Sequence, residues 1–152
     1  MGLDQDIANL SRIDLFEGFG ADQLRLLAFG AETVRLPEGR VLYREGDDAD
    51  SGFVLVSGTI AHQVSRGAEG ERPAGRTIAP ALLGDIALVT ETVRPSTAIA
   101  KTPCELLRLN RAQFRRILEE WPDLAGPVRD RIAESLAAMV SSLSKVGERL
   151  KG

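Results

Sequence analysis

Gly84, Asp85 and Arg94 are residue types that together can hold a phosphate and a hydroxyl group. A glycine lets backbone N–H groups approach a ligand closely, and the first N–H groups of a helical turn are free to bind an anion. Arg94 follows Gly84 by ten residues and can bind a phosphate through two parallel hydrogen bonds. Asp85 can accept a hydrogen bond from a hydroxyl. This spacing therefore indicates recognition of a sugar phosphate.

Each of these side chains also has a plainer interpretation. An isolated arginine is typical of a solvated or salt-bridged surface, and an isolated aspartate is typical of a helix cap. The spacing from Gly84 favours the anion site for Arg94 and leaves both roles open for Asp85. The single histidine, His62, is expected on a surface or barrel-wall strand, and the single cysteine, Cys104, is expected to be a small buried strand residue.

The elements that position this set are predicted to be mainly strands. Short apolar or alternating runs separated by turn residues predict an antiparallel sandwich or barrel. The polar stretch 66–76 is expected to be a mobile hairpin tip. The predicted strands cover residues 33–36, 41–43, 53–56, 59–64, 77–79, 97–100 and 105–109.

Helical patterns flank the predicted strands on both sides. Residues 1–30 carry apolar helical faces, with Asp22 expected to cap a second helix, and Asn110 is expected to cap a helix that ends at Pro122. The pattern as a whole predicts one domain, 1–152, with N-terminal helices over 1–30, a β-barrel over 31–109 and C-terminal helices over 110–152.

Residues 123–151 are predicted to form one long helix with an apolar stripe. The stripe repeats close to every 3.5 residues, as in a coiled-coil seam, and it consists of Val128, Ile132, Leu136, Met139, Leu143, Val146 and Leu150. At 1.5 Å per residue this helix would span roughly 43 Å, which is longer than a small barrel can cover. A parallel dimer seam is therefore favoured, and packing of the stripe against the barrel is the alternative.

Two runs resemble the phosphate-binding cassette of cyclic-nucleotide-binding domains, namely Leu83-Gly84-Asp85-Ile86-Ala87-Leu88 and Arg94-Pro95-Ser96-Thr97-Ala98. The glycine-punctuated run 36–47 and the run Phe53–Gly58 resemble the preceding strands of that family. The family includes catabolite-activator-type regulators, protein kinase A regulatory subunits and nucleotide-gated channels. The resemblance implies a mainly β fold with flanking helices: an antiparallel β-barrel or double-stranded β-helix (jelly roll) with N-terminal helices and a long C-terminal helix.

The resemblance also implies roles for individual residues. Arg94 would hold the cyclic phosphate, Gly84 and Asp85 would meet the ribose 2′-hydroxyl, and the Ala87 N–H would face the phosphate. The long helix would cover the base, with Ser141 and Ser142 as polar candidates for contacting it. An alignment of this helix with the family without gaps would instead place Met139 and Val140 nearer the base. The implied ligand is a cyclic nucleotide, with cyclic AMP favoured over cyclic GMP, and the expected binding residues are Gly84, Asp85, Ile86, Ala87, Arg94, Ser96, Thr97, Ser141 and Ser142.

Three residues depart from the family pattern. Asp85 replaces a glutamate and is one methylene shorter, and Val93 replaces a proline. Pro95 follows the arginine directly and has no N–H to give to the phosphate. The loss of one such donor costs about 1.5–3 kcal/mol, which Ser96 can offset in part through its hydroxyl or N–H.

Composition narrows the classes of function. The net charge of −3 does not favour a nucleic-acid binder, and one cysteine with one histidine leaves no disulfide and no multi-histidine metal site. No paired carboxylates or nucleophile–base set stands out, so no catalytic residue and no metal are expected. The sequence shows neither a secretion signal nor an apolar run of about 20 residues that could span a membrane, so a cytoplasmic location is expected.

Two functions fit these observations. The favoured one is a catabolite-activator-type sensor without a DNA-binding domain: it binds a cyclic nucleotide, forms a homodimer through its last helix and signals to an unidentified effector protein. Related regulators carry a helix-turn-helix domain after the long helix, and no such segment is expected here, so no direct DNA binding is expected either. The alternative is a degenerate domain that binds no nucleotide and serves as a dimeric protein-interaction module.

Overall fold

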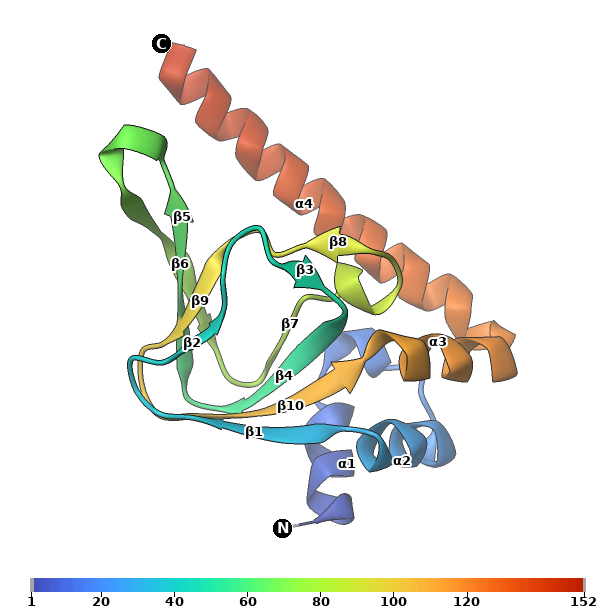
Figure 1. Cartoon of the computed structure of the whole chain (residues 1–152). Coiled ribbons are helices and arrows are strands. Elements are labelled where there is room, and N and C mark those ends of the chain that lie inside the picture. Colours follow the sequence, from blue (N-terminus) through green and yellow to red (C-terminus); the bar gives the residue numbers. More distant parts are fainter. Residues whose placement is uncertain (1, 152) are drawn as a thin grey trace.

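Two antiparallel four-stranded sheets lie face to face and form a jelly roll, with helices at one end (Figure 1). The structure, a computed structural model, describes the backbone of residues 2–151 and the side chains of residues 2–138. One sheet has the strand order β1 (Glu32–Leu36), β10 (Cys104–Asn110), β4 (Ser51–Ser57) and β7 (Ala81–Leu83). The other has the order β2 (Val41–Tyr43), β9 (Thr97–Ala100), β5 (Thr59–Ser65) and β6 (Glu71–Ile78), and a small third sheet pairs β3 (Asp48–Ala49) with β8 (Thr92–Val93). The predicted mainly β jelly roll with flanking helices is thus confirmed, although the strands do not close into one continuous barrel.

Most strands match the predicted runs or extend slightly beyond them, but β3, β7 and β8 were not predicted, and β6 covers residues 71–78 rather than 77–79. Because successive side chains of a strand face opposite sides, Leu106 on β10 packs between the sheets while Leu107 and Leu109 face the helices.

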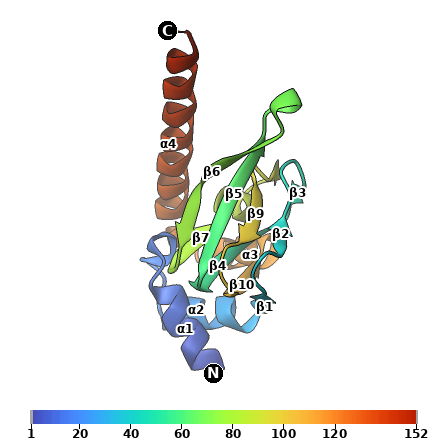
Figure 2. The same cartoon turned by 90° about the vertical axis from the view of Figure 1, so that its left-hand side faces the viewer.

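The region predicted as a loop over residues 66–76 is largely a strand. Residues 71–78 form β6, which pairs antiparallel with β5, and only the 3₁₀ turn η2 (Gly67–Glu69) forms the tip of the hairpin. Pairing with a neighbouring strand overrides the low strand propensity of the polar residues here. The hairpin projects from the same end of the molecule as the C-terminal helix (Figure 2).

The helices fall in the predicted order. They are α1 (Leu3–Ser11), the 3₁₀ turn η1 (Asp14–Phe16), α2 (Ala21–Phe29), α3 (Arg111–Glu120), the 3₁₀ turn η4 (Pro122–Leu124) and α4 (Ala125–Lys151), with a further 3₁₀ turn, η3 (Ile86–Leu88), between β7 and β8 in the chain. Within the described part of the chain, no helix combines the length and the apolarity needed to cross a membrane.

Of the two predicted helix caps, one is confirmed and one is wrong. The Asn110 side chain accepts hydrogen bonds from the N–H groups of Ala112 and Gln113, which confirms it as the cap of α3. The prediction for Asp22 was wrong, because Gly20 is the N-cap of α2 and donates its N–H to the side chain of Gln23. The long helix begins at Ala125 rather than at residue 123, since η4 occupies the residues after Pro122.

Two apolar clusters hold the fold together. One fills the jelly roll between the sheets and consists of Phe53, Leu55, Ile60, Leu83, Ala98, Ala100, Cys104 and Leu106. The other joins the helices to the outer face of the β1-β10-β4-β7 sheet and is centred on Phe16, Phe19 and Phe114, whose ring centroids lie 5.3–6.0 Å apart. Cys104 is buried in the first cluster, as predicted.

The apolar stripe of α4 begins in the helical cluster and then leaves it. Val128 and Ile132 are buried, which matches the alternative of packing against the body, whereas Leu136 is 47% exposed. The stripe residues from Met139 onward lie outside the described side chains, so the dimer seam stays a prediction.

The aromatic cluster yields a stability prediction. Phe114→Ala removes a fully buried ring and should lower the free energy of unfolding by about 3–5 kcal/mol in urea denaturation. Phe29→Ala is the matched control, because Phe29 is 81% exposed and its loss should change stability by less than about 0.5 kcal/mol. Similar losses for the two variants would contradict this packing.

Candidate ligand-binding site

A cavity of about 240 Å³ lies beneath the turn that begins at Gly84. The end of β2, the β3–β8 pair, the turn around η3 and the middle of α4 form its walls. Its lining residues are Tyr43, Ala49, Gly84, Asp85, Ile86, Ala87, Thr92, Val93, Arg94, Pro95 and Leu136. The fold therefore brings five of the predicted binding residues, Gly84 to Ala87 and Arg94, to one cavity.

Arg94 lies in this cavity with a buried guanidinium. Only 5% of the residue is exposed, and its Cζ lies 4.5 Å from the ring centroid of Tyr43 and 5.4 Å from that of Phe53. Its Nη2 donates a hydrogen bond of 3.3 Å to the Ser51 Oγ. Aromatic faces attract a cation, so the two rings stabilise the side chain in this position.

The charge of Arg94 is buried with no acidic partner among the described side chains. Within residues 2–138, no carboxylate forms a salt bridge with this guanidinium. Burial lowers the pKa of Arg94, and burial likewise raises the pKa of the neighbouring Tyr43 hydroxyl. A buried charge is costly unless it is paired, so an anion entering the cavity would supply the missing counter-charge.

Gly84 shapes the turn that faces this arginine. Its φ is +82°, a backbone conformation that glycine adopts without strain. A Cβ at this position would lie 2.7 Å from the Arg94 Nη1 and 3.3 Å from the Ser51 carbonyl oxygen. The absence of a side chain here therefore lets the guanidinium lie directly against the turn.

Asp85 caps the turn in this structure. Its carboxylate accepts a 2.8 Å hydrogen bond from the Ile86 N–H, while the Ala87 N–H donates to the Gly84 carbonyl at 3.1 Å. The alternative that the sequence left open, a helix cap, is thus the contact that the structure contains. A ribose hydroxyl would have to share this carboxylate with the Ile86 N–H.

The hydroxyls of Ser96 and Thr97 are engaged within the protein. The Ser96 Oγ lies 2.9 Å from the Nδ1 of His62, and the Thr97 Oγ1 accepts a hydrogen bond from the Glu45 N–H at 3.0 Å. Both residues are buried, and their roles as ligand contacts stay predictions. Ser141 and Ser142 lie outside the described side chains.

His62 is half-buried on β5 and links two strands. Its Nε2 lies 2.8 Å from the Thr77 Oγ1 on β6, and its Nδ1 contacts Ser96 just before β9. Burial lowers the pKa of His62 below its ordinary value of 6.5. The side chain therefore holds together the hairpin and the segment after Arg94, in the barrel-wall position expected of it.

Sequence reasoning missed the aromatic and apolar walls of the cavity. Tyr43 and Phe53 flank the guanidinium and Leu136 reaches the cavity from α4, yet none of them carries a local motif. Tyr43 is the single tyrosine of the chain and lies at the end of a predicted strand, but neither fact points to a cavity.

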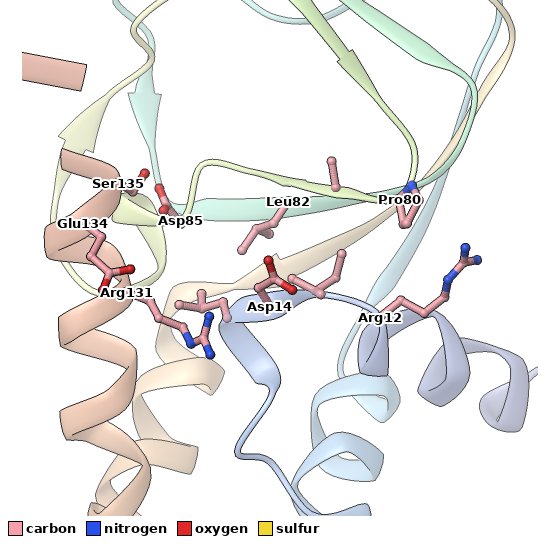
Figure 3. Close-up of a pocket in the computed structure, with 11 residues that line it drawn as sticks. Arg12, Asp14, Pro80, Leu82, Asp85, Arg131, Glu134 and Ser135 are labelled. Atoms are coloured by element: carbon pink, nitrogen blue, oxygen red, sulfur yellow. The ribbon is translucent and has the colours of Figure 1, made fainter. Parts of the chain in front are cut away.

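A second, larger hollow of about 610 Å³ lies between η1, β7 and the first half of α4 (Figure 3). It is lined by charges of both signs, with Arg12 at one end, Glu134 at the other and Asp14 on η1 pointing toward β7. Its Arg131 already pairs with Glu17. The smaller cavity is the better anion site, because it presents a buried arginine with no acidic partner among the described side chains.

The jelly roll and the glycine turn beside a buried arginine define the class of domain to which this chain belongs. The family pattern named "Cyclic nucleotide-binding domain" matches residues 33–120, and the chain belongs to that family. Among the described residues, no group of histidine, cysteine and acidic side chains is arranged to hold a metal ion.

Solved structures agree with this assignment. A cyclic nucleotide-binding-like protein from Brucella abortus is 45% identical, with a TM-score of 0.69 over 76% of this chain and 99% of that one. The sensor domain of the transcriptional regulator DNR from Pseudomonas aeruginosa has a TM-score of 0.79 at 23% identity, over 91% of this chain and 93% of that one. The regulatory domain of Toxoplasma gondii PKA with cAMP has a TM-score of 0.74 at 21% identity, over 89% of this chain and 49% of that one.

Curated relatives are much longer proteins. Lysophospholipase nte1 of Neurospora crassa is 25% identical over 124 residues, which cover 78% of this chain and 8% of that protein. Lysophospholipase nte1 of Aspergillus fumigatus is 26% identical over 112 residues, 74% of this chain and 7% of that protein. The chain thus spans less than a tenth of the length of these relatives.

The contact between Gly84 and Arg94 can be tested by substitution. Gly84→Ala should lose about 1–2 kcal/mol of stability from its positive φ, and about 1 kcal/mol more because the new methyl displaces the guanidinium. Gly39→Ala is the control, because Gly39 has a φ of +87° with open space around its Cβ position. Equal losses in urea denaturation would show that the guanidinium does not rest against the turn.

His62 should make stability depend on pH. Below about pH 6.5, His62 of the unfolded chain binds a proton, whereas the lowered pKa of His62 in the folded state disfavours protonation there. The free energy of unfolding should therefore fall as the pH drops from 7 to 5. His62→Gln removes the only histidine, so the difference in unfolding free energy between wild type and variant isolates its effect. As the pH falls, the wild type should lose stability relative to the variant. A difference that does not change with pH would contradict a buried, neutral His62.

Proposed function

We propose that this domain is a non-enzymatic regulatory sensor that binds a cyclic nucleotide, with cyclic AMP favoured, in the Arg94 cavity. The observation that carries the proposal is the buried guanidinium, which has no acidic partner among the described side chains. Membership of the cyclic nucleotide-binding family, and the neighbour from Toxoplasma gondii that was solved with cAMP, support the same ligand class. The cytoplasm remains the expected location.

The size of the cavity suggests how a nucleotide would lie. Pockets for small ligands commonly measure about 300–1,000 Å³, so a cavity of 240 Å³ has room for the phosphate and ribose but not for a whole nucleotide. The base would then lie at the mouth of the cavity, against Val93 and Leu136, which are 53% and 47% exposed. A base that stacks on these apolar side chains would remove them from contact with water, which is favourable.

Signalling would proceed by a shift between two conformations. An anion that neutralises Arg94 favours whichever state brings the turn and α4 closest to the nucleotide. We propose that the second half of α4 pairs two copies of the chain, and that an effector protein reads the change. Leu136 gives α4 a direct place in the cavity wall, which supports the helix as the moving part.

A second candidate is a degenerate domain that binds no nucleotide and acts as a dimeric interaction module. Two observations favour it. Pro95 offers no N–H beside the arginine, and the Asp85 carboxylate is engaged by the Ile86 N–H. Both reduce the number of groups free to hold a cyclic nucleotide, while the jelly roll and α4 would be retained.

Calorimetric titration separates the two candidates. Cyclic AMP should bind to the wild type, and Arg94→Gln should weaken binding at least about 100-fold because two charge-assisted hydrogen bonds are lost. The variant should stay folded, since it no longer buries a charge. A parallel titration with cyclic GMP tests the preference for the base.

The matched control is Arg40→Gln, because Arg40 is an exposed arginine next to β2 and should leave affinity unchanged. Absence of heat up to millimolar cyclic AMP in the wild type would favour the interaction module. Equal affinity for the wild type and Arg94→Gln would place the nucleotide outside this cavity.

A further inference from the structure

Arg111 reaches from the first residue of α3 back to the ligand cavity. Its Nε donates a 2.7 Å hydrogen bond to the Ala87 carbonyl, and its Nη2 donates to the Ala49 carbonyl. Its backbone N–H donates to the Asp50 carbonyl at 3.1 Å. One residue thus connects α3 to the phosphate turn and to the β3–β4 corner.

The carbonyls that Arg111 binds belong to two residues that line the cavity. Ala87 lies in η3 and Ala49 in β3, and both line the space around Arg94. Arg94 itself binds Ser51 of the same corner through its guanidinium. The segment 49–51 is therefore held by Arg111 from outside the cavity and by Arg94 from inside it.

Helix α3 is in turn linked to α4 through a shared buried cluster. Phe114 and Ile117 of α3 share one buried cluster with Val128 and Ile132 of α4. One turn beyond Ile132, Leu136 lies in the cavity wall. A displacement at the start of α3 would therefore reach the helix that covers the mouth of the cavity.

We infer that Arg111 is a positioning residue that couples the filling of the Arg94 cavity to the placement of α3 and α4. The inference rests on the proposed function for its ligand. An anion that draws the turn and the 49–51 segment toward Arg94 moves the carbonyls to which Arg111 is bonded. The rigid planar fork of a guanidinium can bridge two carbonyls at once, which the point charge of a lysine does less well.

Hydrogen exchange of the whole chain, with and without saturating cyclic AMP, tests this coupling. In the wild type, the ligand should slow exchange both in the turn 84–88 and in α3, by about fivefold or more. In Arg111→Gln, the turn should still be protected by the ligand, whereas the slowing in α3 should fall below about twofold. A residue that only stabilised the fold would instead change exchange equally with and without ligand.

Two further variants keep the test decisive. Arg115→Gln removes an exposed arginine from the same helix and should behave as the wild type does. Arg111→Lys keeps the positive charge and serves as the test if Arg111→Gln does not fold. In this variant the ligand should slow hydrogen exchange in α3 less than it does in the wild type. Full wild-type slowing in α3 in either Arg111 variant would overturn the inference.

The coupling can also be measured without nucleotide, which separates it from the proposed function. If the wild type binds no cyclic AMP, the proposed function fails, and Gly84→Ala then serves to perturb the turn from within. That substitution should change the exchange of α3 amides when Arg111 is present and leave them unchanged in the Arg111→Gln background. Equal changes in the two backgrounds would overturn the role of Arg111 independently of any ligand.

Discussion

The site depends on one positive charge that the fold buries without an acidic partner among the described side chains. Desolvation of the Arg94 guanidinium is unfavourable, and the protein offsets it only in part, with two aromatic faces and a long hydrogen bond to Ser51. A bound anion would supply the counter-charge that the described side chains do not. The cavity, the Gly84 turn and Leu136 of α4 all surround this one buried charge.

The rest of the fold fixes the surroundings of this charge. The jelly roll supplies Tyr43 and Phe53 from β2 and β4, so the aromatic wall is part of the packed core. Gly84 lets the turn approach the guanidinium, and Leu88 at the end of η3 is buried in the helical cluster. The turn that lines the Arg94 cavity is thus attached to the layer of helices.

The placement of Arg94 beside the Gly84 turn could be predicted because its signals are local. Gly84 and Arg94 lie on one short segment, and their spacing needs no knowledge of tertiary structure. Alternation likewise predicted most strands. The two-residue strands β3 and β8 are too short to show a period, and β6 is polar and becomes a strand only through its pairing with β5. Tyr43 and Leu136 join the site from distant segments, and such convergence leaves no trace in a local pattern.

The most direct test of this account is a crystal structure of the chain grown with cyclic AMP. The account predicts a cyclic phosphate within about 3 Å of the Arg94 guanidinium, with the ribose under the Gly84 turn and the base against Leu136. A nucleotide bound elsewhere, for instance in the larger hollow beside η1, would contradict it. So would a cavity that stays free of nucleotide at saturating concentration, with the guanidinium still on Ser51.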